Sequence, residues 1–135
     1  MFEIVRERTF SASHQLRGCN GKCERLHGHN FRVRVAVASP DLDETGMVMD
    51  FHELDELLVS AIAPFDHRHL NDVAEFSLHN PSAEHLARAI GETISTSLAG
   101  KSIWLVYCDV FENDRSKARF YPGMRGYNRC RSNGV

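Results

Sequence analysis

Two histidines separated by one glycine, His27 and His29, form the strongest candidate metal-binding motif in the chain. Side chains two positions apart on a β-strand point to the same side, so both imidazoles can reach one ion at the usual zinc–nitrogen distance of about 2.0–2.1 Å. The best-placed third ligand is His14, which ends the preceding predicted strand on its apolar face. Three histidines leave the fourth tetrahedral position open for a substrate, so the pattern predicts a catalytic Zn²⁺ site.

Two alternatives to this metal site remain open. Isolated histidines are most often solvated or hydrogen-bonded surface residues, and a lone His-x-His motif is weak evidence for a metal. Cys19 and Cys23 could also join His27 and His29 in a structural zinc site, because a Cys-x₃-Cys spacing falls within the range of such sites. The His-x-His arm is shorter than in the usual zinc finger, which favours the three-histidine site.

Two further motifs could move protons. Cys23 lies four residues before His27, where a metal or a protonated histidine would depress its pKa and make it a base or nucleophile; the alternative is a buried loop cysteine. The dipeptide Asp66-His67 places a carboxylate beside an imidazole, a pairing that fixes the tautomer of a catalytic base. Such dipeptides are also common in polar loops.

Glu112 places a carboxylate where the apolar face of a predicted strand would otherwise continue. The preceding side chains on that face are Trp104, Val106, Cys108 and Val110. Glu112 is therefore either a strand-end residue that leaves the core or an acceptor for a ligand with two adjacent donors. A pterin ring has such a pair in its 2-amino group and N3–H.

The composition is that of a soluble globular domain. The chain has 135 residues, 42% hydrophobic and 25% charged, and no apolar run approaches the roughly 18 residues of a membrane span. The N-terminus lacks the continuous apolar stretch of a secretory signal, which predicts a cytoplasmic location. A net charge of −2 argues against nucleic acid as a partner. The four cysteines are too few and too scattered for a disulfide scaffold.

Hydrophobic periodicity predicts an α+β fold with one sheet and two helices. Alternating residues predict strands at 2–14, 29–39, 102–113 and 116–122. One helix is expected from the N-cap Asp50 to Pro64, and a second from the N-cap Asn80 to near Gly100. The order β-β-α-α-β-β predicts a four-stranded antiparallel sheet with both helices on one face.

The organisation is that of a single domain, residues 1–121, followed by a polar, glycine-rich tail at 122–135 that we expect to be poorly ordered. The open sheet has two unprotected edges. Joining the sheets of neighbouring subunits into a barrel would protect them, which predicts a homo-oligomer.

In combination these motifs resemble the 6-pyruvoyl tetrahydropterin synthase family over about residues 3–121. The Cys-x₃-His-Gly-His spacing is closest to the 6-carboxy-5,6,7,8-tetrahydropterin synthase branch of queuosine biosynthesis. The segments that carry the resemblance are 10–14, 23–29, 46–51, 66–71, 80–84 and Glu112. The resemblance implies the tunnelling fold, in which three subunits complete a barrel and two trimers stack into a hexamer with active sites at subunit interfaces.

The resemblance also implies residue roles and a reaction. His14, His27 and His29 would bind Zn²⁺ and Cys23 would transfer a proton. Asp66 and His67 would complete the relay, while Glu112 and Ser82 would bind the substrate. The implied reaction converts a reduced pterin triphosphate, 7,8-dihydroneopterin triphosphate, into 6-carboxy-5,6,7,8-tetrahydropterin, acetaldehyde and triphosphate.

The chain departs from the family pattern at two points. Ala83 lacks a hydroxyl that the pterin-contact segment often carries, and Asn113 follows Glu112 where a threonine is common. Two alternatives therefore remain: a 6-pyruvoyl tetrahydropterin synthase that eliminates triphosphate and retains the side chain, or a zinc- or pterin-binding protein without catalytic activity.

Overall fold

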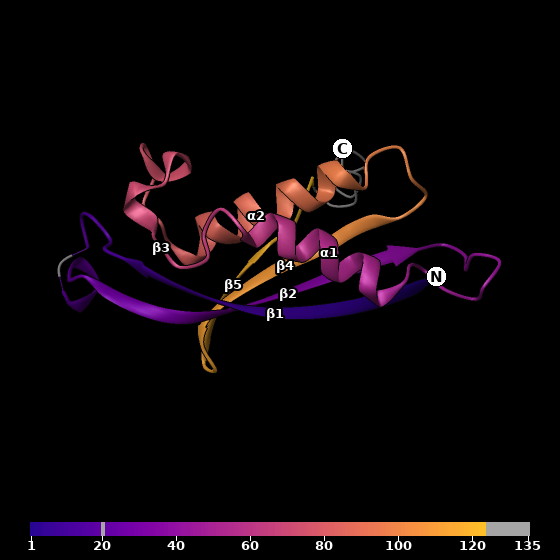
Figure 1. The fold of residues 1–135 in the computed structure, drawn as a ribbon, viewed down its shortest axis with the longest axis horizontal. Coiled ribbons are helices and arrows are strands. Elements are labelled where there is room, and N and C mark those ends of the chain that lie inside the picture. Colours follow the sequence, from indigo (N-terminus) through magenta and orange to yellow (C-terminus); the bar gives the residue numbers. More distant parts are fainter. Residues whose placement is uncertain (20, 124–135) are drawn as a thin grey trace, which may run out of the picture.

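A twisted sheet of five strands forms the frame of the protein (Figure 1). The computed structural model describes residues 1–19 and 21–123. The strands are β1 (Phe2–His14), β2 (His27–Ser39), β3 (Arg68–His69), β4 (Trp104–Asn113) and β5 (Ser116–Phe120), and their order across the sheet is β3-β1-β2-β4-β5. The four predicted strands are confirmed, whereas most of the predicted tail, residues 124–135, lies outside the described residues.

The prediction of a four-stranded, wholly antiparallel sheet was wrong, because β3 adds a fifth strand that runs parallel to β1. β3 has only two residues, too few to produce a periodic sequence pattern. It forms because the chain just before it is attached to β1: the His67 N–H donates to the Ser11 carbonyl at 2.7 Å. The sheet is therefore mixed.

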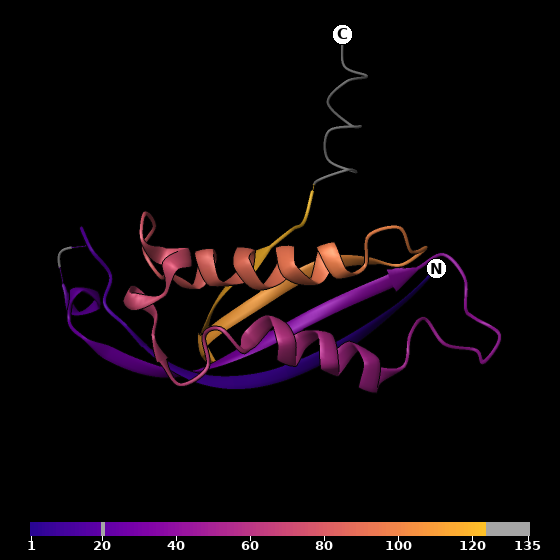
Figure 2. The same cartoon turned by 45° about the horizontal axis from the view of Figure 1, so that its top comes forward.

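Both predicted helices lie on the same face of the sheet (Figures 1 and 2). They are α1 (Phe51–Ile62) and α2 (Ala83–Ser97). Asp50 caps α1 as expected, its carboxylate accepting from the His52 N–H at 2.7 Å. The N-cap of α2 is Ser82 rather than the predicted Asn80, because the Asn80 side chain instead binds the backbone of Arg17.

Between sheet and helices lies an apolar core that continues to the end of the sheet where the three histidines stand. Phe31, Val33 and Val35 of β2 are completely buried, and they pack with Leu54 and Leu58 of α1. The described part of the chain contains no helix long and apolar enough to cross a membrane.

The opposite face of the sheet carries a buried carboxylate. Asp109 of β4 has no exposed surface and accepts hydrogen bonds from Lys117 Nζ at 2.8 Å and from Arg119 Nε at 2.6 Å, both on β5. Burial alone would raise the pKa of Asp109, but the hydrogen bonds from Arg119 and Lys117 outweigh it and lower the pKa below its ordinary value. This pair of contacts ties the short edge strand β5 to the sheet.

We predict that Asp109→Asn lowers the free energy of unfolding by about 2 kcal/mol at pH 7, since it removes charge-assisted hydrogen bonds. Because the folded-state pKa of Asp109 is lowered, the advantage of the wild type is present above the unfolded-state pKa. It should shrink as the pH falls below about 4. Urea unfolding at several pH values measures the difference in free energy of unfolding between the wild type and the variant. Asp114→Asn is the matched control, because Asp114 is 91% exposed and its contact with Arg32 should contribute less than about 1 kcal/mol. Equal effects of the two substitutions would contradict the assignment.

Candidate functional site

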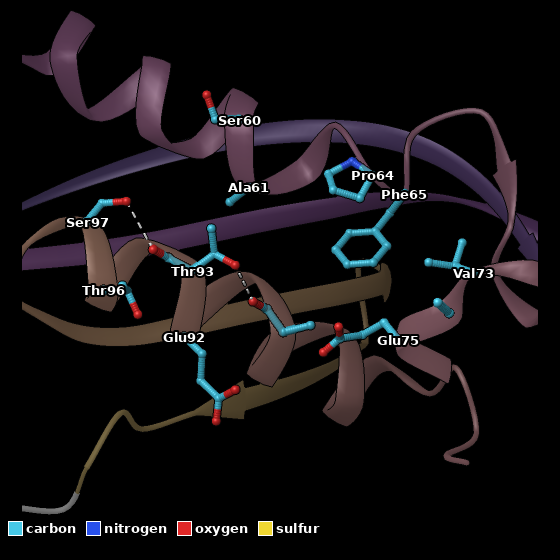
Figure 3. Close-up of a pocket in the computed structure, with 12 residues that line it drawn as sticks. Ser60, Ala61, Pro64, Phe65, Val73, Glu75, Glu92, Thr93, Thr96 and Ser97 are labelled. Carbon is cyan, nitrogen blue, oxygen red and sulfur yellow. Dashed lines mark hydrogen bonds between the residues drawn. The ribbon is translucent and has the colours of Figure 1, made fainter. Parts of the chain in front are cut away.

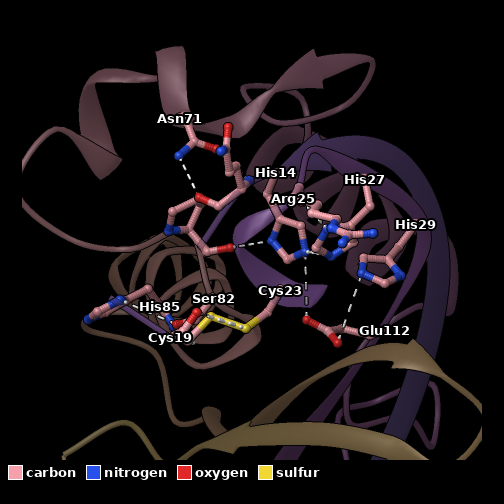
Figure 4. Close-up of polar contacts among 12 residues, drawn as sticks. His14, Cys19, Cys23, Arg25, His27, His29, Asn71, Ser82, His85 and Glu112 are labelled. Carbon is pink, nitrogen blue, oxygen red and sulfur yellow. Dashed lines mark hydrogen bonds and ion pairs between the residues drawn. A yellow bond between two sulfur atoms is a disulfide. The ribbon is translucent and has the colours of Figure 1, made fainter. Parts of the chain in front are cut away.

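The three predicted histidine ligands lie together at one end of the sheet (Figure 4). Their candidate ligand nitrogens all lie within 4.8 Å of one another, and His14 Nε2 is 2.9 Å from His27 Nε2. Two nitrogens on one tetrahedral zinc ion stand about 3.4 Å apart, given the usual bond length. The structure thus brings the three predicted ligands together, and small ring movements would bring their nitrogens to the spacing of a metal site.

Backbone carbonyls orient two of the imidazoles. His14 Nδ1 is 2.7 Å from the Pro81 carbonyl oxygen, and His27 Nδ1 is 2.6 Å from that of Arg25. A hydrogen bond from Nδ1–H to a carbonyl leaves Nε2 with a free lone pair, as in most histidines that bind metals. Both Nε2 atoms therefore face the interior of the cluster.

The third imidazole supplies an independent test of the fit to a metal ion. His29 Nε2 is buried and has no hydrogen-bond partner among the described residues. A buried nitrogen without a partner is costly unless a ligand satisfies it. Burial lowers the pKa of His14 and of His29, which favours the neutral imidazole that binds metals. The residues present fit a divalent metal.

Glu112 faces the same cluster from β4. Its Oε1 is 3.9 Å from His14 Nε2 and its Oε2 is 4.0 Å from His29 Nε2, while 28% of the side chain is exposed (Figure 4). The carboxylate is thus beside the candidate metal site and still accessible. A ligand that presents two N–H donors to Glu112 would place its neighbouring atoms next to the histidines.

Cys23 is joined to Cys19 by a disulfide, a pairing that the sequence did not predict. Cys23 lies in the 3₁₀ turn Lys22–Glu24, and its carbonyl accepts from the Leu16 N–H at 2.9 Å. The sulfurs of Cys19 and Cys23 are bonded to each other, so they are not available as zinc ligands. The described structure therefore does not form the alternative zinc site of two cysteines and two histidines. A thiolate at Cys23 requires reduction of this disulfide.

Asp66 and His67 form the expected pair but not beside Cys23. Asp66 Oδ1 is 2.8 Å from His67 Nδ1 and also accepts from the Ser11 N–H at 3.1 Å. The His67 ring is 82% exposed, and its backbone has a φ of 56°, an uncommon value for a residue other than glycine. No hydrogen bond or ion pair among the described residues links this pair to Cys23 or to the histidine cluster.

Two asparagines near the site were not assigned a role at the site from sequence. Asn71 binds the backbone of Gln15, and Asn80 binds that of Arg17. Ser82, predicted to bind substrate, caps α2 by accepting from the His85 N–H at 3.2 Å. No local sequence pattern reveals these contacts of Asn71 and Asn80, because each joins residues more than fifty positions apart.

A cavity of about 640 Å³ lies elsewhere, between α1 and α2 (Figure 3). Among its lining residues are Phe65, Glu92 and Thr93. It contains none of the predicted site residues and is therefore separate from the histidine cluster.

An α+β sheet backed by two helices, with three histidines and a carboxylate converging at one end, defines a small protein with a candidate catalytic metal centre. Residues 3–123 match the model of the 6-pyruvoyl tetrahydropterin synthase family. The chain belongs to this family of enzymes.

Several curated relatives carry the name 6-carboxy-5,6,7,8-tetrahydropterin synthase. One, from Synechocystis sp., is 46% identical over 95 residues, which cover 64% of this chain and 70% of the relative. A Drosophila melanogaster relative named 6-pyruvoyl tetrahydrobiopterin synthase is 34% identical over 109 residues, covering 70% of this chain and 65% of the relative. The fold is similar to that of 6-pyruvoyl tetrahydropterin synthase from Caenorhabditis elegans, with a TM-score of 0.78, 23% identity, and coverage of 89% of this chain and 94% of the other.

We predict that Cys23 reacts with iodoacetamide only after reduction, and that Cys108 does not react in the folded protein in either state. Cys108 has no exposed surface, and burial raises the pKa of its thiol to about 12. Mass spectrometry of the peptides that carry the two residues measures this. Labelling of Cys23 without reductant would show that the disulfide is absent from the isolated protein.

We predict that the protein binds one zinc ion per chain and that His29→Ala weakens zinc affinity by at least about tenfold, since even the partners of metal ligands contribute 10–100-fold. Titration against a chromogenic chelator measures the affinity. His52→Ala is the control, because the His52 ring is 81% exposed and only contacts Glu56 on α1. Equal zinc affinity of the two variants would exclude His29 as a ligand.

Proposed function

We propose that the protein is a zinc-dependent lyase that converts 7,8-dihydroneopterin triphosphate and water into 6-carboxy-5,6,7,8-tetrahydropterin, acetaldehyde and triphosphate. The observation that carries the proposal is the histidine cluster with a partnerless buried nitrogen at His29 and the accessible carboxylate of Glu112 within about 4 Å. The names of several curated relatives support the same reaction. On this proposal the protein acts in queuosine biosynthesis.

The chemistry assigns a task to each group around the site. Zinc held by His14, His27 and His29 would act as a Lewis acid on substrate oxygens. Glu112 would accept two N–H bonds from the pterin ring and so orient the side chain that reacts. Ser82, at the start of α2, would also bind the substrate.

In this proposal proton transfer is carried out by Cys23 and His67, with Asp66 as the partner of His67. The reduced Cys23 thiolate would remove a proton from a side-chain carbon of the substrate, and His67 would return one. Asp66, paired with His67 Nδ1 at 2.8 Å, would orient the ring and stabilise its imidazolium form, whose Nε2–H would donate that proton.

The exposure of His67, and the lack of a hydrogen bond or ion pair linking it to Cys23 among the described residues, support a site that combines residues of neighbouring subunits. An imidazole that is 82% exposed in one chain is available to the site of another. We therefore propose a cytoplasmic homo-hexamer, a dimer of trimers whose sheets join into a barrel. The free edge of β5 and the outer edge of β1 before Ser11 offer the unpaired backbone groups that such joining needs.

The second candidate function is that of a 6-pyruvoyl tetrahydropterin synthase, which eliminates triphosphate but keeps the side chain. The similarity to the Drosophila melanogaster relative of that name supports it. The two functions use the same metal ligands and differ in product, so product identity separates them.

We predict that the reduced, zinc-loaded protein releases acetaldehyde and forms 6-carboxy-5,6,7,8-tetrahydropterin from 7,8-dihydroneopterin triphosphate. Mass spectrometry of the products measures this, with chelator-treated protein as a control. Cys23→Ala should abolish turnover and leave the zinc content unchanged, because Cys23 is not a metal ligand in this proposal. A product that retains a pyruvoyl side chain would support the second candidate. Bound zinc with unchanged substrate would contradict both.

A further inference from the structure

We propose that Asn71 and Asn80 are positioning residues that hold Cys23 in place for proton transfer. The inference rests on the role proposed above for Cys23. Among the described residues no side-chain hydrogen bond joins either asparagine to the histidine cluster or to Cys23, so each would act through the loop that connects β1 to the cysteine.

The two asparagines bind the chain in the same way. The Gln15 N–H donates to Asn71 Oδ1 at 2.8 Å, and Asn71 Nδ2 donates to the Gln15 carbonyl at 2.7 Å (Figure 4). The Arg17 N–H donates to Asn80 Oδ1 at 2.8 Å, and Asn80 Nδ2 donates to the Arg17 carbonyl at 2.7 Å. We call each pair of bonds an asparagine clasp. A clasp satisfies both backbone groups of one residue, as a neighbouring β-strand would.

Leu16 lies between the two clasped residues, and its N–H donates to the Cys23 carbonyl at 2.9 Å. The clasps therefore fix the peptide group to which Cys23 is attached. The Arg17 side chain strengthens the second clasp, because its guanidinium donates to the carbonyls of Phe76 at 3.1 Å and His79 at 3.2 Å. Residues 71–80, before α2, thus hold the loop that leads to Cys23 at several points.

Once the Cys19–Cys23 disulfide is reduced, few other contacts among the described residues hold the loop. Its 3₁₀ turn has no buried residue, and Gly18 has a φ of 79°, a value that favours glycine and allows the backbone to turn sharply. A misplacement of about 1 Å in a reacting group can lower a rate by about a hundredfold. Restraint of the loop therefore decides whether the Cys23 thiolate reaches the substrate carbon.

The metal ligands do not depend on the clasps in the same way. His14 precedes the first clasp, is paired with His27 in the β1–β2 ladder, and is held at Nδ1 by the Pro81 carbonyl. Loss of a clasp should consequently move Cys23 without releasing zinc. Zinc content therefore distinguishes loss of a clasp from loss of a residue that supports the metal site.

The test uses Asn71→Asp and Asn80→Asp in the reduced, zinc-loaded protein. Aspartate has the same shape but places an oxygen where the Nδ2 donor was, opposite a backbone carbonyl. We expect kcat to fall about 10–100-fold, as for other residues that orient catalytic groups, with KM within about twofold of the wild type. Amide hydrogen exchange in peptides covering residues 15–25 should accelerate at least about tenfold, since the restraining bonds are lost. Zinc content should not change.

Asn113→Asp is the matched control. The Asn113 oxygen, which aspartate retains, accepts from the Arg115 N–H at 2.8 Å, so exchange in residues 15–25 should not change. Either clasp variant tests the proposal on its own, because each removes one clasp.

Unchanged exchange and kcat in a folded clasp variant would overturn the proposal, as would zinc loss in proportion to lost activity. If the wild type does not turn over the pterin, the proposed function fails, while hydrogen exchange still shows whether the clasps restrain the loop.

Discussion

The pairing of β1 with β2 is the constraint on which the site depends. In its antiparallel register His14 stands opposite His27, and Ala12 stands opposite His29. A slip of one residue would turn the side chains of one strand to the other face of the sheet and separate the three imidazoles. Phe10 and Phe31, directly opposed in the same ladder with ring centroids 5.2 Å apart, help to fix the register from within the core.

A second segment, residues 66–81, follows the end of β1 and continues past it. Asp66 and His67 attach to Ser11, and β3 pairs with Ala12 and Ser13. Further along, Asn71 binds Gln15, and Asn80 binds Arg17, while the Pro81 carbonyl contacts His14. The chain between the two helices thus acts as a partner for β1 in which side-chain amides replace the backbone of a strand. Its contacts hold Asp66 and His67, the buried His14 and the loop that leads to Cys23 on one support.

The sequence was sufficient for the features that repeat along the chain. Alternating residues located β1, β2, β4 and the shorter β5, and the same alternation placed His14 and His29 on the core face. Asp50 and the helical period of Leu54 and Leu58 located α1. These features depend on neighbours within a few residues, where periodicity carries the information.

Features that depend on distant partners were missed. Asn80-Pro81 resembles the start of a helix, yet the Asn80 side chain binds a residue 63 positions away, so Ser82 caps α2 instead. β3 exists through its contact with β1. The Cys19–Cys23 disulfide joins near neighbours, but its formation depends on how the loop closes. The hydrogen bond between the His67 N–H and the Ser11 carbonyl, 56 positions apart, likewise had no local signal. The composition of a segment does not indicate which distant backbone group it will meet.

The two ends of the loop between β1 and Cys23 are held together, and this determines how the length of the loop can vary. The Leu16–Cys23 hydrogen bond and the two clasps bring the ends of the loop together whatever lies between them. Inserted residues between Gly18 and Lys22 would extend outward from these ends, and doubling the length of a flexible loop costs only about 0.6 kcal/mol. Homologous chains can therefore lengthen or shorten this tip during evolution while Cys23 and the histidines keep their positions.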